Sequence, residues 1–336
     1  MKMGAAAVTV ATANNCKPAL LQIGASVPAL REVLESVYDL YTLGEQEDEA
    51  TFLAKKGPSI RGVVICEDPD CDDMTVIEKE LVSKLPNLEI VSSFDRMDLS
   101  KAVDFRRCNK LGVHVTDTRD ALTYFSAATA HRLLKAITGE VCCMGQYVRA
   151  CRWPCEANYG IPYRLCNKHV GVVGLHQIGT AIATQMESLG CTIGYWCTKQ
   201  NHQYPNYAYY DNVVDLARHS DILIIACPLT EETKKIVNRK VLDALGPQGF
   251  VVNVSRGPVV HEDELASALK DGRIAGAGLD VFENDGQVPD ELIQFDTCVL
   301  QPHPGCSMES QQAKADLVVA NLEAHFAGKP LLTPVC

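Results

Sequence analysis

The sequence lacks an apolar run of membrane-spanning length, and its start lacks the features of a secretory signal peptide. It also lacks a basic excess, because 31 Lys and Arg stand against 42 Asp and Glu and give a formal net charge of −11. A negative field argues against nucleic acid or an anionic membrane as the main partner. We therefore expect a cytoplasmic protein with no nucleic-acid or membrane partner.

Paired CxxC motifs are absent as well, although the chain has 15 cysteines. The nearest cluster is Cys151, Cys155 and Cys166, and its spacing fits no common zinc pattern. An odd cysteine count without a signal peptide favours a reducing compartment. These observations predict scattered, mostly buried thiols and no metal site.

Alternating apolar runs and helical patterns fill the chain, and no repeat interrupts them. In the first part, runs at 19–23, 62–66, 88–92 and 113–116 alternate with helical spacing at 27–38 and 74–85. A helix is predicted from 126 to about 141, and six further strands at 169–173, 191–196, 221–226, 250–254, 276–281 and 298–300. Strands that alternate with helices indicate an α/β fold with parallel sheets, and the second series predicts a doubly wound nucleotide domain.

A glycine-rich turn opens that second series. Gly174 and Gly179 begin and end the six-residue motif between strand and helix, and His176 stands where a dinucleotide-binding turn has its middle glycine. The two glycines allow the tight turn and the packing of helix on strand. For His176 three interpretations remain open: the ring crowds the pyrophosphate, the turn binds no cofactor, or the ring swings outward and binding persists.

The second strand of this series ends without an acidic residue that could accept the ribose hydroxyls of NADH. Lys199 follows it and could pair with the 2′-phosphate of NADPH, although a solvated surface lysine is the alternative. This pattern favours NADPH over NADH.

Three polar residues follow apolar strands in the last third of the chain: Arg256, Asp285 and His303. A cation can hold a substrate carboxylate, and an imidazole can donate a proton while a carboxylate keeps it charged. Downstream of a dinucleotide-binding turn, this set suits hydride transfer to a small-molecule 2-oxo acid.

Several stretches together resemble the D-isomer-specific 2-hydroxyacid dehydrogenases, and among them the reductases of hydroxyphenylpyruvate, hydroxypyruvate and glyoxylate. The stretches are 88–94, 220–223, 226–230, 243–247, 256–258, 276–283 and 321–334. The resemblance implies a flavodoxin-like substrate domain at 1–122 and 305–336 and a Rossmann-type domain at 123–304, each a doubly wound parallel sheet. It also implies a homodimer formed through the nucleotide domain and the segment from Tyr147 to Tyr163.

The resemblance further implies roles for individual residues. Arg256 matches the substrate-binding arginine, His303 the proton donor, and Asp280 a residue near the nicotinamide, whereas Asp285 stands where the family has a glutamate. The expected substrate contacts are Ser93, Phe94, Arg256 and His303. The expected cofactor contacts are Gly174, His176, Gln177, Ile178, Gly179, Thr198, Lys199, Cys227, Pro228, Thr233, Val254, Ser255, Asp280 and Gly305.

Three departures from the family pattern leave a second function open. They are His176, the shorter Asp285, and a segment after Phe94 that has no glycine to let the backbone approach a substrate carboxylate. Glu283 lies two residues before Asp285 and is a poor substitute for it. The sequence therefore favours a reductase of 2-oxo acids, with a catalytically inactive binding or partner-interaction protein as the alternative.

Overall fold

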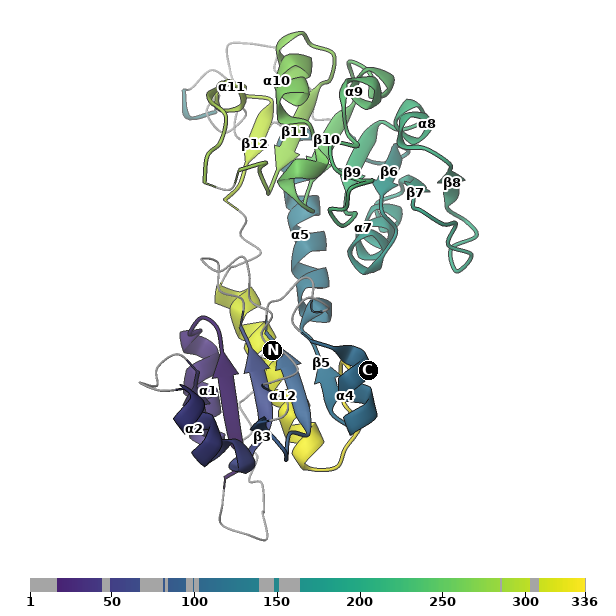
Figure 1. Cartoon of the computed structure of the whole chain (residues 1–336). Coiled ribbons are helices and arrows are strands. Elements are labelled where there is room, and N and C mark those ends of the chain that lie inside the picture. The colour runs from purple at the N-terminus through teal and green to yellow at the C-terminus, as the bar shows by residue number, and fades with distance from the viewer. Residues whose placement is uncertain are drawn as a thin grey trace. The chain divides into compact units, whose positions relative to one another are not determined.

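The computed structural model describes residues 17–43, 49–66, 81, 84–94, 99, 103–138, 148–150, 164–284, 286–302 and 308–335. The chain divides into two compact units, Met1–Arg119 with Gln311–Cys336, and Asp120–Ser310 (Figure 1). Each unit contains its own parallel sheet with helices, which confirms the predicted α/β class.

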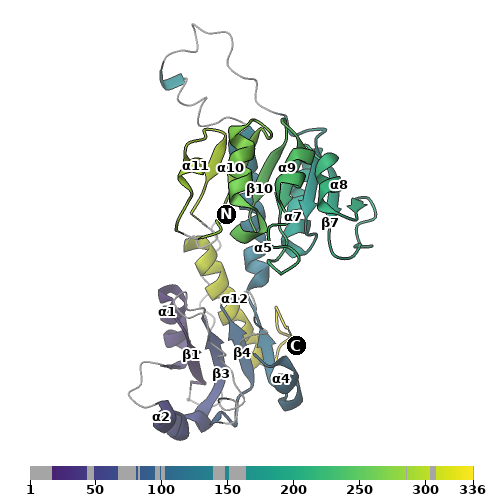
Figure 2. The ribbon, with the colours of Figure 1, turned by 45° about the horizontal axis from the view of Figure 1, so that its top comes forward.

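The first unit has a five-stranded sheet in the order β2-β1-β3-β4-β5, the flavodoxin-like order. Its strands are β1 (Ala19–Ile23), β2 (Asp39–Thr42), β3 (Ile60–Ile65), β4 (Ile90–Ser93) and β5 (His114–Thr116). Leu20 and Val64 pack on one face with α1 (Pro28–Val37) and α12 (Met308–Phe326), the yellow helix of Figure 2. Leu21 and Val63 alternate onto the other face, with α2 (Glu49–Lys56) and α4 (Phe105–Leu111).

The second unit has a seven-stranded sheet in the order β12-β11-β10-β9-β6-β7-β8. Its strands are β6 (His169–Val173), β7 (Thr192–Trp196), β8 (Ala208–Tyr210), β9 (Ile222–Ile225), β10 (Phe250–Asn253), β11 (Gly276–Leu279) and β12 (Cys298–Leu300). The strand order reverses between β6 and β9, and ligands of such sheets bind at the carboxyl ends beside that switch point.

Helices cover both faces of this sheet. One core joins it to α5 (Arg119–Thr138) and α7 (Gln177–Ser188). The other joins it to α8 (Val213–Arg218), α9 (Arg239–Leu245), α10 (Glu262–Lys270) and α11 (Asp290–Ile293). Each face of the sheet is therefore buried, as a doubly wound domain requires.

The structure corrects the predicted elements in two ways. The nucleotide unit has seven strands instead of six, because β8 was not predicted, and β2 was not predicted either. Both lie at sheet edges and are only partly buried, so they carry no apolar run.

The helix predicted from 126 begins at Arg119, where the Asp117 carboxylate accepts a hydrogen bond from the Arg119 amide. The predicted helix at 74–85 lies mostly outside the described residues.

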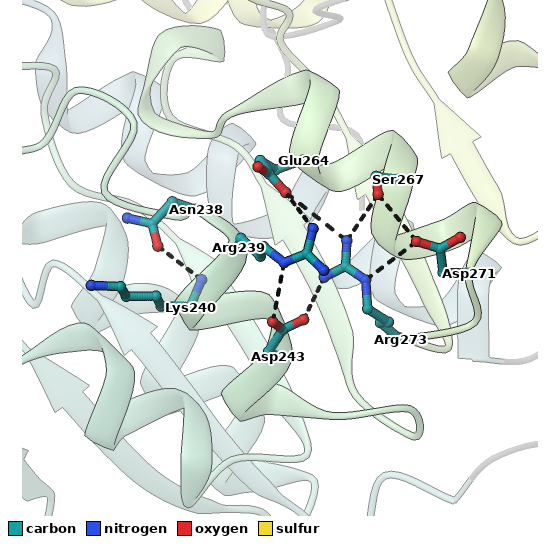
Figure 3. Close-up of polar contacts among 8 residues, drawn as sticks. All are labelled: Asn238, Arg239, Lys240, Asp243, Glu264, Ser267, Asp271 and Arg273. Carbon is teal, nitrogen blue, oxygen red and sulfur yellow. Dashed lines mark hydrogen bonds and ion pairs between the residues drawn. The ribbon is translucent and has the colours of Figure 1, made fainter.

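A charged network joins α9 to α10 (Figure 3). Arg273 ion-pairs with Asp243, and it lies 3.6 Å from Asp271. Arg239 reaches Asp243 at 3.6 Å and Glu264 at 3.9 Å. Only 19% of the Arg273 side chain is exposed, so this guanidinium is the best-shielded cation of the network. We interpret the network as a structural clamp between the two helices.

No helix in the described part of the chain is long and apolar enough to cross a membrane. Within the same residues, no three His, Cys, Asp or Glu side chains gather as metal ligands. Of the cysteine cluster singled out in the sequence, Cys166 is exposed, while Cys151 and Cys155 lie outside the described residues.

Candidate active site

The turn between β6 and α7 depends on its two glycines. Gly174 has φ +99°, and a Cβ built there would lie 2.7 Å from the Cα of Cys227. A Cβ on Gly179 would lie 1.8 Å from the carbonyl oxygen of Gly174. Both contacts involve backbone, so neither position accepts a side chain without a shift of the turn. The tight turn and the close approach of α7 to β6 are thus built into this sequence.

His176 occupies a position of this turn whose backbone does not need glycine. It is the N-cap of α7, with φ −94° and ψ −163°, an extended conformation open to any residue. Its exposed side chain crosses to the end of β7, where Nε2 lies 3.4 Å from Sγ of Cys197. The imidazole adds volume to the turn but leaves its fold intact.

A pocket of about 490 Å³ lies beside His176 at the carboxyl ends of β6, β7 and β9. It is lined by Gly174, His176, Trp196, Cys197, Thr198, Cys227, Pro228, Thr230, Glu231, Glu232 and Thr233. Six of the residues expected to contact a cofactor are thereby brought together: Gly174, His176, Thr198, Cys227, Pro228 and Thr233. Lys199 is exposed but does not line the pocket.

The loop after β9 forms one wall of this pocket through its own hydrogen bonds. The buried Thr233 hydroxyl donates to the Pro228 carbonyl at 2.6 Å and accepts from the Thr230 amide at 2.7 Å. Burial raises the pKa of the Cys227 thiol to about 12, so this part of the wall stays neutral. Hydrogen bonds within the loop therefore hold its conformation.

Two other expected cofactor contacts, Gln177 and Ile178, have contacts with other residues of this unit. Gln177 is exposed, and its amide donates to the Asp120 carboxylate at 3.0 Å. Ile178 is partly buried against the core formed with α5 and α7. Neither lines the pocket.

Arg256 stands on a turn that follows β10 and is held by Asn253. The buried Asn253 side chain accepts from the Ser255 amide and hydroxyl, both at 3.0 Å, and donates to the Arg256 carbonyl at 3.1 Å. Val254 and Ser255 are buried, whereas Arg256 is half-buried and donates only to the Ser255 carbonyl at 2.7 Å. Arg256 forms no ion pair with a residue of the described ranges.

Gly257 allows this turn to lie directly against the backbone of Phe282 and Glu283. A Cβ on Gly257 would lie 1.7 Å from the carbonyl oxygen of Phe282. Asp280 is buried just before that segment. Asp285, His303 and Gly305 lie outside the described residues.

Glu283 interacts with two other residues, Lys235 and Glu262. Its carboxylate ion-pairs with Lys235 at 2.8 Å, and its amide donates to the buried Glu262 carboxylate at 2.5 Å.

In the first unit, Ser93 and Phe94 are buried at the carboxyl end of β4. The Phe94 carbonyl accepts a hydrogen bond from the Thr118 hydroxyl. The ammonium of Lys314, a residue of α12 with 1% exposure, lies 5.6 Å from the centre of the Phe94 ring. Residues 95–98, which include the segment without glycine, lie outside the described residues.

Sequence reasoning missed Asn253, Gly257 and Lys314. Asn253 is a polar residue at the end of an apolar strand, and this signal could have indicated a turn-forming side chain. Gly257 directly follows Arg256, which could have suggested a close backbone approach. Lys314 lies in a helix with many polar residues, and nothing in that pattern distinguishes it.

Comparison with known proteins agrees with this geometry. Residues 132–305 match the family described as D-isomer specific 2-hydroxyacid dehydrogenase, NAD binding domain. Hydroxyphenylpyruvate reductase of Plectranthus scutellarioides is 45% identical over 307 residues, which cover 91% of this chain and 95% of the relative. A glyoxylate/hydroxypyruvate reductase A of Arabidopsis thaliana is 44% identical over the same length and coverage.

Among solved structures, the NADPH-dependent glyoxylate/hydroxypyruvate reductase of Sinorhizobium meliloti in complex with NADP and malonate is 35% identical. It has a TM-score of 0.71, with 95% of this chain and 97% of that chain covered. With a matched nucleotide domain and relatives that span nearly the whole chain, this protein belongs to the D-isomer-specific 2-hydroxyacid dehydrogenase family.

Proposed function

We propose that this protein is a reductase that converts 2-oxo acids to D-2-hydroxy acids with NADPH. The substrates are hydroxyphenylpyruvate, hydroxypyruvate or glyoxylate, which are named in the relatives. The observation that carries the proposal is the Arg256 turn. A cation without a described ion-pair partner is held by a buried asparagine at the edge of a nucleotide-binding sheet.

The residues around the β6–α7 turn fit a dinucleotide. Gly174 and Gly179 permit the close approach of backbone, and the N-terminus of the 12-residue helix α7 favours an anionic phosphate. When bound, NADPH supplies a hydride to the substrate carbonyl carbon. Residues lining the pocket and the turn, including Gly174, Thr198 and Cys227, would hold the cofactor. The resemblance adds Gly305 as a cofactor contact and Asp280 as a residue near the nicotinamide.

Arg256 would bind the carboxylate and carbonyl oxygens of the 2-oxo acid through its planar guanidinium. His303 would donate a proton to the carbonyl oxygen, and Asp285 would hold the imidazole in its charged form. Ser93 and Phe94 would contact the substrate, as the family resemblance implies. Lys199 and the absent acidic residue after β7 support NADPH over NADH.

The test is NADPH oxidation with each of the three 2-oxo acids, beside direct titration of NADPH and NADH. We expect turnover of at least one acid and tighter binding of NADPH. Binding of NADPH without turnover of any acid would instead favour a binding protein, and no described contact supports that alternative.

We also propose a cytoplasmic homodimer formed through the nucleotide domain and the segment from Tyr147 to Tyr163, with domain boundaries at 122/123 and 304/305. Light scattering of the purified full chain measures the mass, and a monomer at micromolar concentration would contradict the dimer.

A further inference from the structure

The pocket beside the β6–α7 turn has an unusual set of charges. Of its lining residues, His176 is the one basic side chain, and Glu231 and Glu232 are the two acidic ones. All three are exposed. Lys199 is also exposed but lies outside the lining.

His176 reaches the place where such sheets distinguish the two nicotinamide cofactors. In dinucleotide-binding sheets, the residue that contacts the adenosine ribose lies at the end of the second strand, roughly 20 residues after the glycine turn begins. In this chain that strand is β7, and Cys197 and Thr198 follow it. The buried Cys197 thiol has no carboxylate to offer the ribose hydroxyls, and the His176 ring lies against it.

We propose that His176 is the cofactor-specificity residue of this protein, and that its imidazole, anchored on Cys197, recognises the 2′-phosphate of NADPH. Cys197 engages Nε2 and leaves Nδ1 for a ligand. This inference rests on the proposed function, because it requires that the pocket binds the adenosine half of a nicotinamide cofactor.

The charges of the pocket lining bear on this recognition. Glu231 and Glu232 are the acidic residues of the lining and oppose a phosphate from the loop after β9. The imidazole of His176 is the one basic side chain of the lining, and its free ring nitrogen can form a hydrogen bond with the phosphate.

The experiment measures dissociation constants of the full-length protein for ADP-ribose and for ADP-ribose carrying the 2′-phosphate, at one pH and one ionic strength. NADH and NADPH are titrated in parallel. His176→Ala removes the imidazole, and His176→Arg supplies another hydrogen-bond donor. His169→Gln is the matched control, because His169 is an exposed histidine at the amino end of β6 and does not line the pocket. Calorimetry reports binding without reference to turnover.

We expect His176→Ala to lower the preference for the 2′-phosphate about tenfold, the effect of losing one hydrogen bond to a charged group. His176→Arg should retain the preference, and His169→Gln should match the parent. Equal weakening of both ligands by His176→Ala would overturn the inference, as would an unchanged preference in that variant. Failure of the parent to bind any of the four ligands would overturn the proposed function itself.

Discussion

The β6–α7 turn and the turn after β10 leave the same edge of one parallel sheet, yet they tolerate change differently. In the first, Gly174 and Gly179 are fixed by backbone contacts, while position 176 has an ordinary extended conformation and an exposed side chain. In the second, Asn253 bonds the turn internally and Gly257 touches the Phe282 backbone. The departure from the cofactor motif is therefore at position 176, the one glycine position of the motif at which the fold does not require glycine.

The largest effect should come from Gly257→Ala. Its new Cβ meets the Phe282 carbonyl oxygen at 1.7 Å, so the turn must move away from the chain that leads to Asp285. We expect a loss of about 3 kcal/mol or more in the free energy of unfolding, at the upper end of overpacking effects. Urea denaturation measures it.

Gly272→Ala is the matched control for that change. Gly272 has φ +66° and nothing within 4 Å of a new Cβ, so only the backbone conformation resists the substitution. The expected loss is about 1 kcal/mol. Equal losses in the two variants would show that the contact with Phe282 does not constrain the turn.

The next effect concerns turnover. His303→Ala should mainly lower kcat, by about 10²- to 10⁴-fold, because it removes a proton donor used in the transition state. Arg256→Ala should also raise KM, because it removes the carboxylate anchor, and Arg256→Lys should recover only part of the loss. Steady-state kinetics with the best 2-oxo acid separate the two patterns. Parent-like kinetics in both alanine variants would refute the catalytic assignment.

The same comparison explains what could be predicted from sequence. Apolar runs gave the central strands because these are buried on both faces, but β2 and β8 are partly exposed edge strands without such a run. Arg256 and His176 could be located by motif. The contact of His176 with Cys197 could not, since it joins residues 21 positions apart through the pairing of β6 with β7. The role of Asn253 likewise depends on a turn geometry that follows from folding.

A smaller effect should follow from Asn253→Ala, which removes three hydrogen bonds from the Arg256 turn. Leaving buried Ser255 groups unsatisfied should cost about 2–3 kcal/mol of stability. Because the turn also positions Arg256, KM for the 2-oxo acid should rise at a temperature where the variant is fully folded.

Arg273→Met serves as its control. It breaks the charged network between α9 and α10 (Figure 3) and should lower stability without touching the Arg256 turn. Its KM should therefore match the parent. A raised KM in Arg273→Met as well would mean that general loosening of the unit, and not the position of Arg256, controls substrate binding.

The smallest effect should come from His176→Ser, at the position that the fold leaves free. His176 is the N-cap of α7 and makes no side-chain cap hydrogen bond, so the first turn of the helix lacks this stabilisation. A serine hydroxyl can accept from a backbone amide of that turn, which should raise stability by about 0.5–1 kcal/mol. Thermal unfolding of the cofactor-free protein measures the change without interference from binding. A fall in stability would instead show that the contact between the imidazole and Cys197 stabilises the turn more than a helix cap does, and that position 176 is held as firmly as Gly257.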